Sequence, residues 1–186
     1  MDSKKIEKNR EKVLEMNENY KIFTKELIEF LGDEYFLAPA SASLDLYNCC
    51  PGGLVAHSLI IAKYAVNLNN LLPDKVKIPI ETLIKVSFLS QIGKAFLYVN
   101  NETEWEIRQG KIYTYNDLTP MTIGERSLMY AMRNGVILSD DEYQAILYSD
   151  KDDYSKISKF LLSPLTQIIR MAFQLSIIQE KSKNAE

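Results

Sequence analysis

The residues whose types could carry chemistry are few, and the first of them is the single histidine, His57. An imidazole has an ordinary pKa of ~6.5, so it can act as a general base or as a metal ligand. A zinc or iron centre built from several histidines is excluded within one chain, because the sequence holds only one. A Cys/His zinc site would need more than the two cysteines, Cys49 and Cys50.

Cys49 and Cys50 are either reactive thiols or structural residues. They are adjacent, which is poor geometry for a mutual disulfide. No basic residue flanks them to lower the pKa of a thiol, so we favour a structural role. Two cysteines and no secretory signal predict a reducing, cytoplasmic setting.

The composition predicts an ordinary globular domain. The chain has 186 residues, of which 46% are hydrophobic and 25% charged, and a formal net charge of −3. That length suits one domain. No apolar run reaches the ~18–20 residues that span a bilayer, which argues against a membrane protein. A mildly acidic chain without a dense basic block also argues against nucleic acid as a partner.

Helical periodicity and stop signals organise the first half of the chain. Residues 3–31 are predicted to form one helix that ends at Gly32. We assign residues 1–34 to an amphipathic N-terminal helix that packs on, or extends from, a domain over residues 35–181. Within that domain we expect a loop over 36–51, a helix from Gly52-Gly53 to about Leu72 and a buried apolar helix from about Ile80 to Ile92.

Residues 96–115 are rich in β-branched and aromatic side chains, which predicts a small β-hairpin. Its strands would be Trp105–Arg108 and Lys111–Tyr115, joined by a turn at Gln109-Gly110. Capping residues and breakers then predict three helices, over about Ile123–Arg133, from Ser139 to about Ser149 and from Ser163-Pro164 to about Lys181, with 182–186 fraying. The fold class is therefore mainly α with a small hairpin.

Seven short motifs follow one another along the domain. They are FLAPAS at 36–41, GGLVAHS at 52–58, SQIGK at 90–94, Trp105 in the hairpin, TIGERS at 122–127, LSDDEYQAILYS at 138–149 and MAFQLS at 171–176. Their order and spacing over roughly residues 35–178 resemble the HD-domain phosphohydrolase superfamily, closest to the small HD hydrolases of bacterial and phage genomes. The resemblance implies an HD-domain-like helical bundle with a hairpin insertion.

Enzymes of that superfamily hold their metal with His and Asp side chains at six recurring positions, and one of these is kept here, as His57. The other five positions carry Ser90, Gln91, Ile123, Ser149 and Phe173. A divalent cation needs several charged or imidazole donors that converge on one point. Without a metal-bound hydroxide, phosphoester hydrolysis of the HD type has no nucleophile. The resemblance therefore implies a pseudoenzyme without a metal or other cofactor.

We expect the six positions to form a closed or remodelled vestigial pocket, with His57 hydrogen-bonded inside it. Buried polar groups without partners would be costly, which explains the neutral replacements as a set. Ile123 and Phe173 are predicted to fill the vacant volume. The remaining three are predicted to satisfy one another without net charge: Ser90, Gln91 and Ser149.

Two cations leave a ligand-binding alternative open. Lys94 matches a lysine that lies near the substrate phosphate in similar enzymes, and Arg126 could supply a second positive charge. Together they could bind a phosphate or a nucleotide without cleaving it. The simpler expectation is a helix-end lysine and a surface arginine that pair with local carboxylates.

A rebuilt metal site is the alternative from the enzyme class. Four carboxylates could recruit Mg²⁺ or Ca²⁺ to a metal-dependent phosphohydrolase: Glu142, Asp150, Asp152 and Asp153. The run SDKDDYS lacks the spacing and the glycine of an EF-hand loop, so a solvated turn is the simpler expectation.

The hairpin aromatics are either a binding face or ordinary cross-strand pairs: Tyr98, Trp105, Tyr113 and Tyr115. The leading hypothesis for function is a catalytically inactive HD-like protein that acts by binding a protein partner or a second copy of itself. The N-terminal helix and the hairpin are the surfaces on which we expect that binding. An origin in a phage or bacterial genome fits the resemblance.

Overall fold

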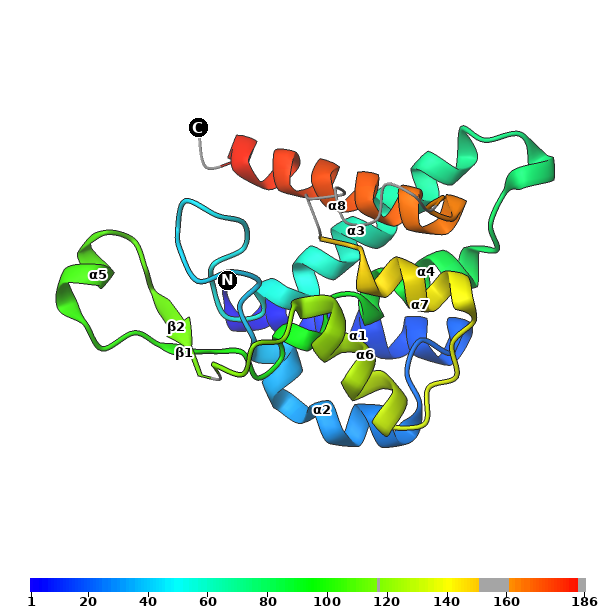
Figure 1. Cartoon of the computed structure of the whole chain (residues 1–186). Helices are drawn as coiled ribbons and strands as arrows, with labels where there is room; N and C mark the ends of the chain where they lie inside the picture. Colours follow the sequence, from blue (N-terminus) through cyan, green and yellow to red (C-terminus); the bar gives the residue numbers. More distant parts are fainter. Residues whose placement is uncertain (117, 151–160, 184–186) are drawn as a thin grey trace.

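In the computed structural model, which describes residues 1–116, 118–150 and 161–183, helices pack into a bundle and a small arm projects from one side (Figure 1). The α-helices are α1 (Ser3–Tyr20), α2 (Lys25–Leu37), α3 (Gly53–Asn70), α4 (Ile80–Leu89), α5 (Glu104–Arg108), α6 (Ile123–Arg133), α7 (Asp140–Leu147) and α8 (Pro164–Lys183). Two 3-10 turns, η1 (Asp74–Val76) and η2 (Ile92–Lys94), and two strands, β1 (Tyr98–Asn100) and β2 (Tyr113–Tyr115), complete the described elements. The prediction of a mainly helical fold with a small antiparallel sheet is confirmed.

The centre of the bundle is α3, which packs along both α4 and α8. Leu54, Ile61 and Ala65 lie on one face of α3 and are fully buried. Burying a side chain of the size of leucine or isoleucine contributes about 1.5–3 kcal/mol, so this face holds the helices together. As predicted, α4 is apolar nearly all round, and Phe88 and Leu89 are fully buried. No helix in the described part of the chain has the length and apolar character needed to cross a bilayer.

The first 37 residues form two helices, so the prediction of one helix over residues 3–31 is wrong. Lys21 adopts the left-handed backbone conformation (φ 50°) and ends α1. The Thr24 hydroxyl then accepts a hydrogen bond from Leu27 N (3.1 Å) and starts α2. Gly32, the predicted stop, interrupts α2 with non-helical backbone angles (φ 52°, ψ −155°), and a further helical segment follows to Leu37. A left-handed backbone conformation at one residue does not change the spacing of the apolar residues, so this spacing did not indicate the break.

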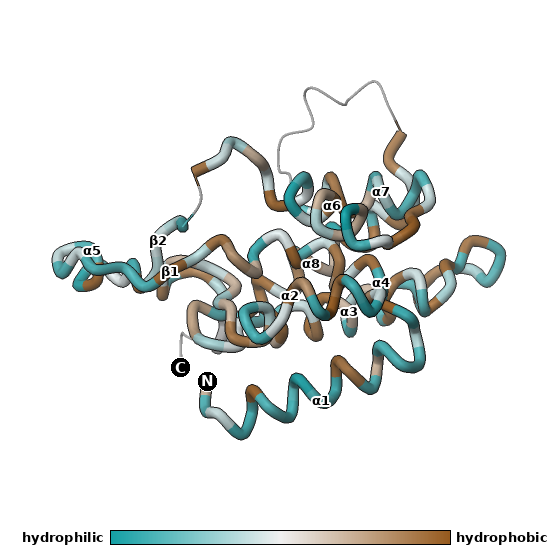
Figure 2. The backbone as a smooth tube through the Cα atoms, turned by 90° about the horizontal axis from the view of Figure 1, so that it is seen from below, coloured by the Kyte–Doolittle hydropathy of each residue, from teal (hydrophilic) through white to brown (hydrophobic). Residues whose placement is uncertain are grey.

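α1 lies across the outside of the bundle, where Figure 2 shows its alternating polar and apolar residues along the lower edge of the molecule. Its contacts are with α2, α3 and α4, and Val13 is its fully buried residue. Outside that contact, α1 is largely exposed and charged.

η2 lies directly against the first turns of α6. The Gly93 N–H donates a hydrogen bond to Ser127 Oγ (2.9 Å), and that hydroxyl donates to Ser90 O (3.2 Å). A Cβ atom on Gly93 would lie 2.5 Å from the carbonyl oxygen of Ile123, where no real side chain fits. Glycine therefore sets how closely two of the predicted motifs, SQIGK and TIGERS, approach each other.

The last three helices follow the predicted signals. Thr122 and Ser139 each form a capping box at the start of α6 and α7. Ser163 Oγ accepts a hydrogen bond from Thr166 N (3.2 Å) at the start of α8. α8 continues to Lys183, two residues beyond the predicted end, and residues 184–186 of the predicted frayed tail lie outside the described residues.

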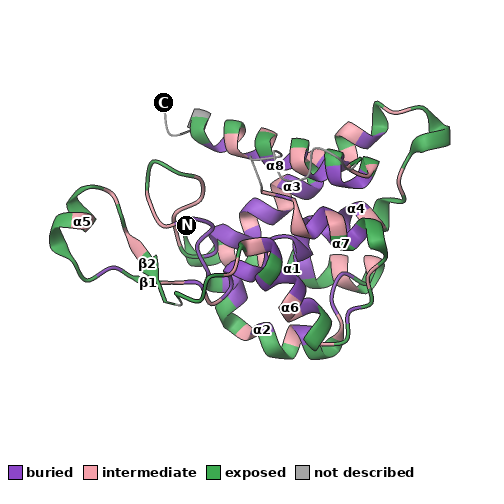
Figure 3. Ribbon diagram, viewed as in Figure 1, coloured by how far each residue is buried: buried purple, intermediate pink, exposed green. Residues whose placement is uncertain are grey.

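The arm is a hairpin, and its strand β2 lies within the predicted strand Lys111–Tyr115, but the other predicted strand is wrong. β1 and β2 pair antiparallel with Tyr98 opposite Tyr115 and Asn100 opposite Tyr113. The predicted strand Trp105–Arg108 lies within the short helix α5 between them. The Asn101 side chain organises this end of the arm, because its Oδ1 accepts from Thr103 N (3.0 Å) and its Nδ2 donates to Glu106 (3.0 Å). These side-chain contacts favour the turn into α5 over the strand that β-prone residues such as Trp105 would favour. Figure 3 shows that most of the arm is exposed.

Candidate functional site

The vestigial pocket is built around His57, which is fully buried on the inner face of α3. Its Nδ1 lies 3.0 Å from Oε1 of Glu180, a buried carboxylate on α8. Burial lowers the pKa of His57, and the hydrogen bond with Glu180 opposes that shift only in part. The imidazole is therefore neutral at neutral pH and donates its Nδ1 proton to Glu180. Among the described residues, no hydrogen-bond partner reaches the buried Nε2 of His57.

Two aromatic rings enclose the imidazole. Tyr47, from the loop between α2 and α3, stacks on His57 with ring centroids 4.5 Å apart and an interplanar angle of 20°. Phe173, from α8, meets the edges of both rings, at 5.5 Å from His57 and 5.9 Å from Tyr47. Phe173 thus fills space beside the histidine, as the sequence predicts for this position.

Lys94, at the end of η2, places its ammonium beside these rings. Its Nζ donates a hydrogen bond to Tyr47 Oη (3.2 Å) and lies 4.9 Å from the Tyr47 ring centroid and 5.8 Å from that of Phe173. Lys94 lies at a helix end, as the simpler expectation describes, but only 3% of the residue is exposed. Burial lowers the pKa of Lys94 to about 8, although the charges of Asp150 and Glu180 favour the protonated form.

The other neutral replacements satisfy one another only in part. Gln91 Nε2 donates to Ser90 Oγ (3.3 Å), and Ser90 Oγ donates to Ser87 O (3.1 Å). Ser149 Oγ instead donates to Ile146 O (3.1 Å) in its own chain segment, so the predicted three-way arrangement with Ser149 is not formed. A serine hydroxyl reaches the carbonyl of its own helix turn more readily than a distant side chain. In the described structure, the buried Oε1 of Gln91 has no hydrogen-bond partner.

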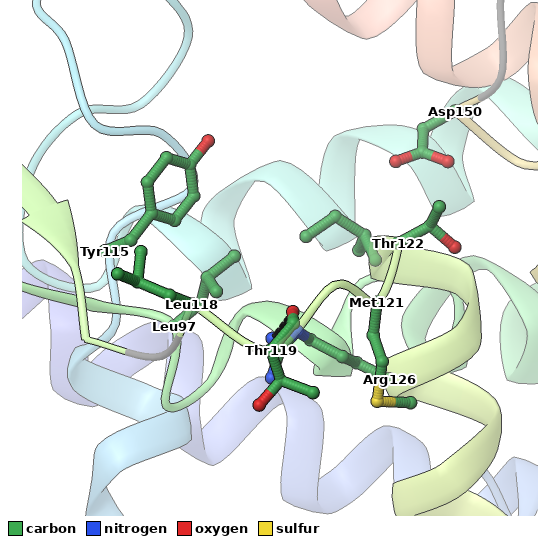
Figure 4. Close-up of a pocket in the computed structure, with 9 residues that line it drawn as sticks. Leu97, Tyr115, Leu118, Thr119, Met121, Thr122, Arg126 and Asp150 are labelled. Atoms are coloured by element: carbon green, nitrogen blue, oxygen red, sulfur yellow. Dashed lines mark hydrogen bonds between the residues drawn. The ribbon is translucent and has the colours of Figure 1, made fainter.

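A hollow of about 490 Å³ lies next to the vestigial pocket, between the arm and α6. Arg126 is buried in its wall and donates to the carbonyl oxygen of Thr119 (2.8 Å), as Figure 4 shows. It is therefore not the surface arginine of the simpler expectation. Asp150 stands on another wall of the hollow. Ile123 also lines the hollow and is half-buried.

The proposed carboxylate cluster is not assembled by the described residues. Glu142 lies in the first turn of α7, where it accepts from Ser139 N (2.9 Å) and pairs with Lys85 (3.0 Å). Asp150 follows the opposite end of that helix. Asp152 and Asp153 lie outside the described residues. Within residues 1–116, 118–150 and 161–183, no three His, Cys, Asp or Glu side chains are grouped to hold a metal ion.

Cys49 and Cys50 are both free and half-buried in the loop before α3. Burial raises the pKa of the Cys49 thiol, which disfavours the reactive thiolate. Their position supports the structural role over the reactive one.

Sequence reasoning missed two members of the pocket, Tyr47 and Glu180. Glu180 follows Ser176 by four residues and Phe173 by seven, so all three share one helical face. An acidic residue on that buried face was a readable signal. Tyr47 lies in a loop, where no periodicity indicates which way a side chain points.

No family model, curated protein or solved structure matches this chain. The relationship to the HD-domain hydrolases therefore stays a prediction from the motifs. The pocket itself offers an imidazole hydrogen-bonded to a carboxylate, and an ammonium that contacts the imidazole through Tyr47. These groups can hold protons and opposite charges, but they are not a converging set of cation ligands.

The single histidine makes the protonation state of the pocket directly measurable. We expect the pKa of His57 to lie below its ordinary value of 6.5, because burial disfavours the imidazolium. Imidazole ¹⁵N–¹H spectra recorded from pH ~4.5 to ~8 report both this pKa and the Nδ1–H tautomer. Since the unfolded chain takes up this proton at a higher pH, His57 should make stability fall as the pH drops below 6.5.

Glu180→Gln is the matched variant for that titration. It removes the charge that favours the imidazolium, so the pKa of His57 should fall further. A pKa at or above 6.5 in the unaltered protein would contradict the arrangement.

Lys94→Met tests the buried ammonium. The native pKa of Lys94 is about 8 against an ordinary 10.5, so between these values the unfolded chain still binds a proton that the native state has released. The free energy of unfolding should therefore rise with pH relative to that of the variant, by about 2 kcal/mol between pH ~7.5 and ~9.5. Denaturant titrations over this range measure the difference. A difference between the two proteins that does not change with pH would refute the prediction.

Proposed function

We propose that this protein is a catalytically inactive relative of the HD-domain hydrolases that acts by binding a protein partner. The observation that carries the proposal is the filling of the space beside His57. Tyr47 and Phe173 enclose the imidazole at 4.5 and 5.5 Å, and Lys94 places a buried ammonium against both rings. The HD-like motifs predict a metal at this position in an active relative.

Electrostatics supports the loss of metal chemistry. With a pKa of about 8, Lys94 is largely protonated at neutral pH. Its charge acts on His57, where it further lowers the pKa of the imidazole. A divalent cation at the same place would meet this repulsion in a medium of low dielectric, where like charges interact strongly. The rings around it supply no ligands to offset that cost.

Binding needs an exposed surface, and the arm offers one. Trp105 on α5 is 67% exposed and Tyr115 on β2 is 56% exposed. Exposed aromatic residues are enriched among the side chains that dominate protein interfaces. Tyr98 packs against Tyr115 as an ordinary cross-strand pair, with ring centroids 5.6 Å apart and the rings tilted by 35°, so only part of the predicted aromatic face is open. We propose further that the protein works in the cytoplasm and is phage or bacterial in origin.

Metal analysis of the purified protein, combined with a phosphoester and nucleotide hydrolysis screen, tests the proposal. We expect far less than one metal ion per chain and no turnover that a chelator abolishes, because the pocket lacks converging ligands. Stoichiometric Mn, Fe or Zn together with chelator-sensitive turnover would overturn the proposal.

A restored variant is the positive control for that test. It returns the expected ligands to the five replaced positions: Ser90→His, Gln91→Asp, Ile123→His, Ser149→His and Phe173→Asp. If the motifs are placed as in HD enzymes, the folded variant should gain a metal ion that the unaltered chain does not hold.

A phosphate or nucleotide sensor is a second candidate, which two buried cations favour. Arg126 lines the hollow, and Lys94 interacts electrostatically with Asp150 and Tyr115, which line the same hollow. A bound ligand would stabilise the fold, by about 2.7 kcal/mol at a hundred times its Kd.

Thermal unfolding with inorganic phosphate and with a set of nucleotides tests this candidate. If it is right, the melting temperature should rise with one of these ligands, and Lys94→Met should lose that rise. A melting temperature that no ligand raises would eliminate the sensor.

A further inference from the structure

We propose that the outer edge of β1, with the groove beside it, is a docking site for an extended basic segment of a partner protein. The site deepens the proposed binding function and rests on it. Three independent features carry the proposal: an open strand edge, an apolar groove along it and a negative potential at its end.

The hydrogen-bonding pattern shows which backbone groups of β1 are open. In an antiparallel pair, residues alternate between those bonded to the neighbouring strand and those whose N–H and C=O point away from it. Two bonds to the β2 side bracket the strand: Asn101 N to Ile112 O (2.9 Å) and Asn116 N to Leu97 O (2.8 Å). The backbone groups of Tyr98 and Asn100 therefore point to the outer edge.

The opposite edge of the sheet is already covered. Tyr113 N–H donates to Ala42 O (3.0 Å), and Leu44 N–H donates to Gly110 O (2.9 Å), so the loop before α3 lies along the β2 side. Within the described part of the chain, no comparable segment bonds to the outer edge of β1. An open strand edge is a template on which an extended peptide can add a further strand.

An apolar groove of about 590 Å³ runs between β1 and the end of α2. Leu37 and Val99, on its two sides, are 52% and 42% exposed. Pro39 and Pro51 complete its rigid walls. Side chains of an added strand alternate between two faces, so every second one would meet this groove. Figure 3 shows the exposed arm that carries one wall of it.

The end of the groove is negative. Asp33 and Glu34 line it, and no lysine or arginine is among its lining residues. α2 also ends there without a basic residue in its last turn, so its C-terminal carbonyls add to the negative potential. Arg10 pairs with Asp33 (2.7 Å), whereas Glu34 forms no ion pair within the described residues. A peptide with lysine or arginine side chains complements this surface.

The same charges argue against a second copy as the occupant. A two-fold pairing of β1 with itself would bring Glu34 and the neighbouring Glu102 of each copy toward the same surface of the other. Like charges at an interface oppose association. A partner protein of opposite charge fits better.

Fluorescence anisotropy with short labelled peptides tests the site on the full chain. The probes are eight-residue peptides of about one strand length that alternate lysine with valine, leucine or tyrosine, and matched peptides with glutamate for lysine. We expect saturable binding of at least one lysine peptide, roughly tenfold or more tighter than its glutamate match. N-methylation of one alternate set of residues should abolish binding and that of the other set should not, because only one set faces the strand edge.

Two variants locate the site independently. Asn100→Pro removes an outward N–H without touching the bonds to β2, and should weaken the lysine peptide about tenfold or more. Glu104→Pro is its control, because it lies at the first position of α5, where proline is tolerated. Glu34→Lys changes only a surface charge and should reverse the preference toward the glutamate peptide.

The outcomes separate this site from the broader function. The site at β1 would be overturned if no lysine peptide bound saturably, or if N-methylation of either set had the same effect. The proposed binding function would then have to use another surface. Metal-dependent turnover would contradict the proposed inactive binding function, whereas peptide binding at β1 would stay unchanged. Sedimentation velocity is the last test. A dimer that Asn100→Pro dissociates would show that a second copy, and not a basic partner, occupies the edge.

Discussion

The buried charge of Lys94 is the constraint on which the arrangement of the pocket depends. An ammonium moved from water into a protein interior costs several kcal/mol unless its surroundings compensate. Here the Tyr47 hydroxyl accepts its hydrogen bond, the faces of two rings surround it, and Glu180 supplies the opposite charge beyond His57. Tyr47 lies in the loop before α3, and Phe173 and Glu180 lie on α8, so this one charge ties η2 to that loop and to α8.

Local signals predicted most of the fold, and they failed where a non-local contact or a single backbone angle decided. The capping box at Ser139 lies within four residues of sequence, and α7 begins where it indicates. The break at Lys21 depends on one left-handed residue, which leaves the apolar pattern unchanged. Trp105 favours a strand by its type, but the Asn101 side chain favours a turn into α5.

The same distinction applies to the pocket. Motif order indicated His57 and Phe173 as neighbours, and they are 5.5 Å apart between ring centroids. It could not indicate that the Ser149 hydroxyl donates to the carbonyl oxygen of Ile146 in its own segment. A serine near a helix turn can always bond to such a local carbonyl, so its position in a motif does not determine its partner. The sequence did not indicate Tyr47 as a pocket residue. Its loop has no period, and only the packed structure determines that it stacks on the histidine.

The loop that closes the pocket also builds the groove beside β1. Tyr47, near its middle, is anchored over His57 by stacking and by the hydrogen bond from Lys94. Pro39 and Pro51, near its two ends, line the groove. A side chain fixed in a packed interior restricts the backbone that carries it. The position of Tyr47 over His57 therefore also restricts the shape of the groove. The packing of Tyr47 against His57 and Phe173 therefore holds in place the loop from which one wall of the groove is made.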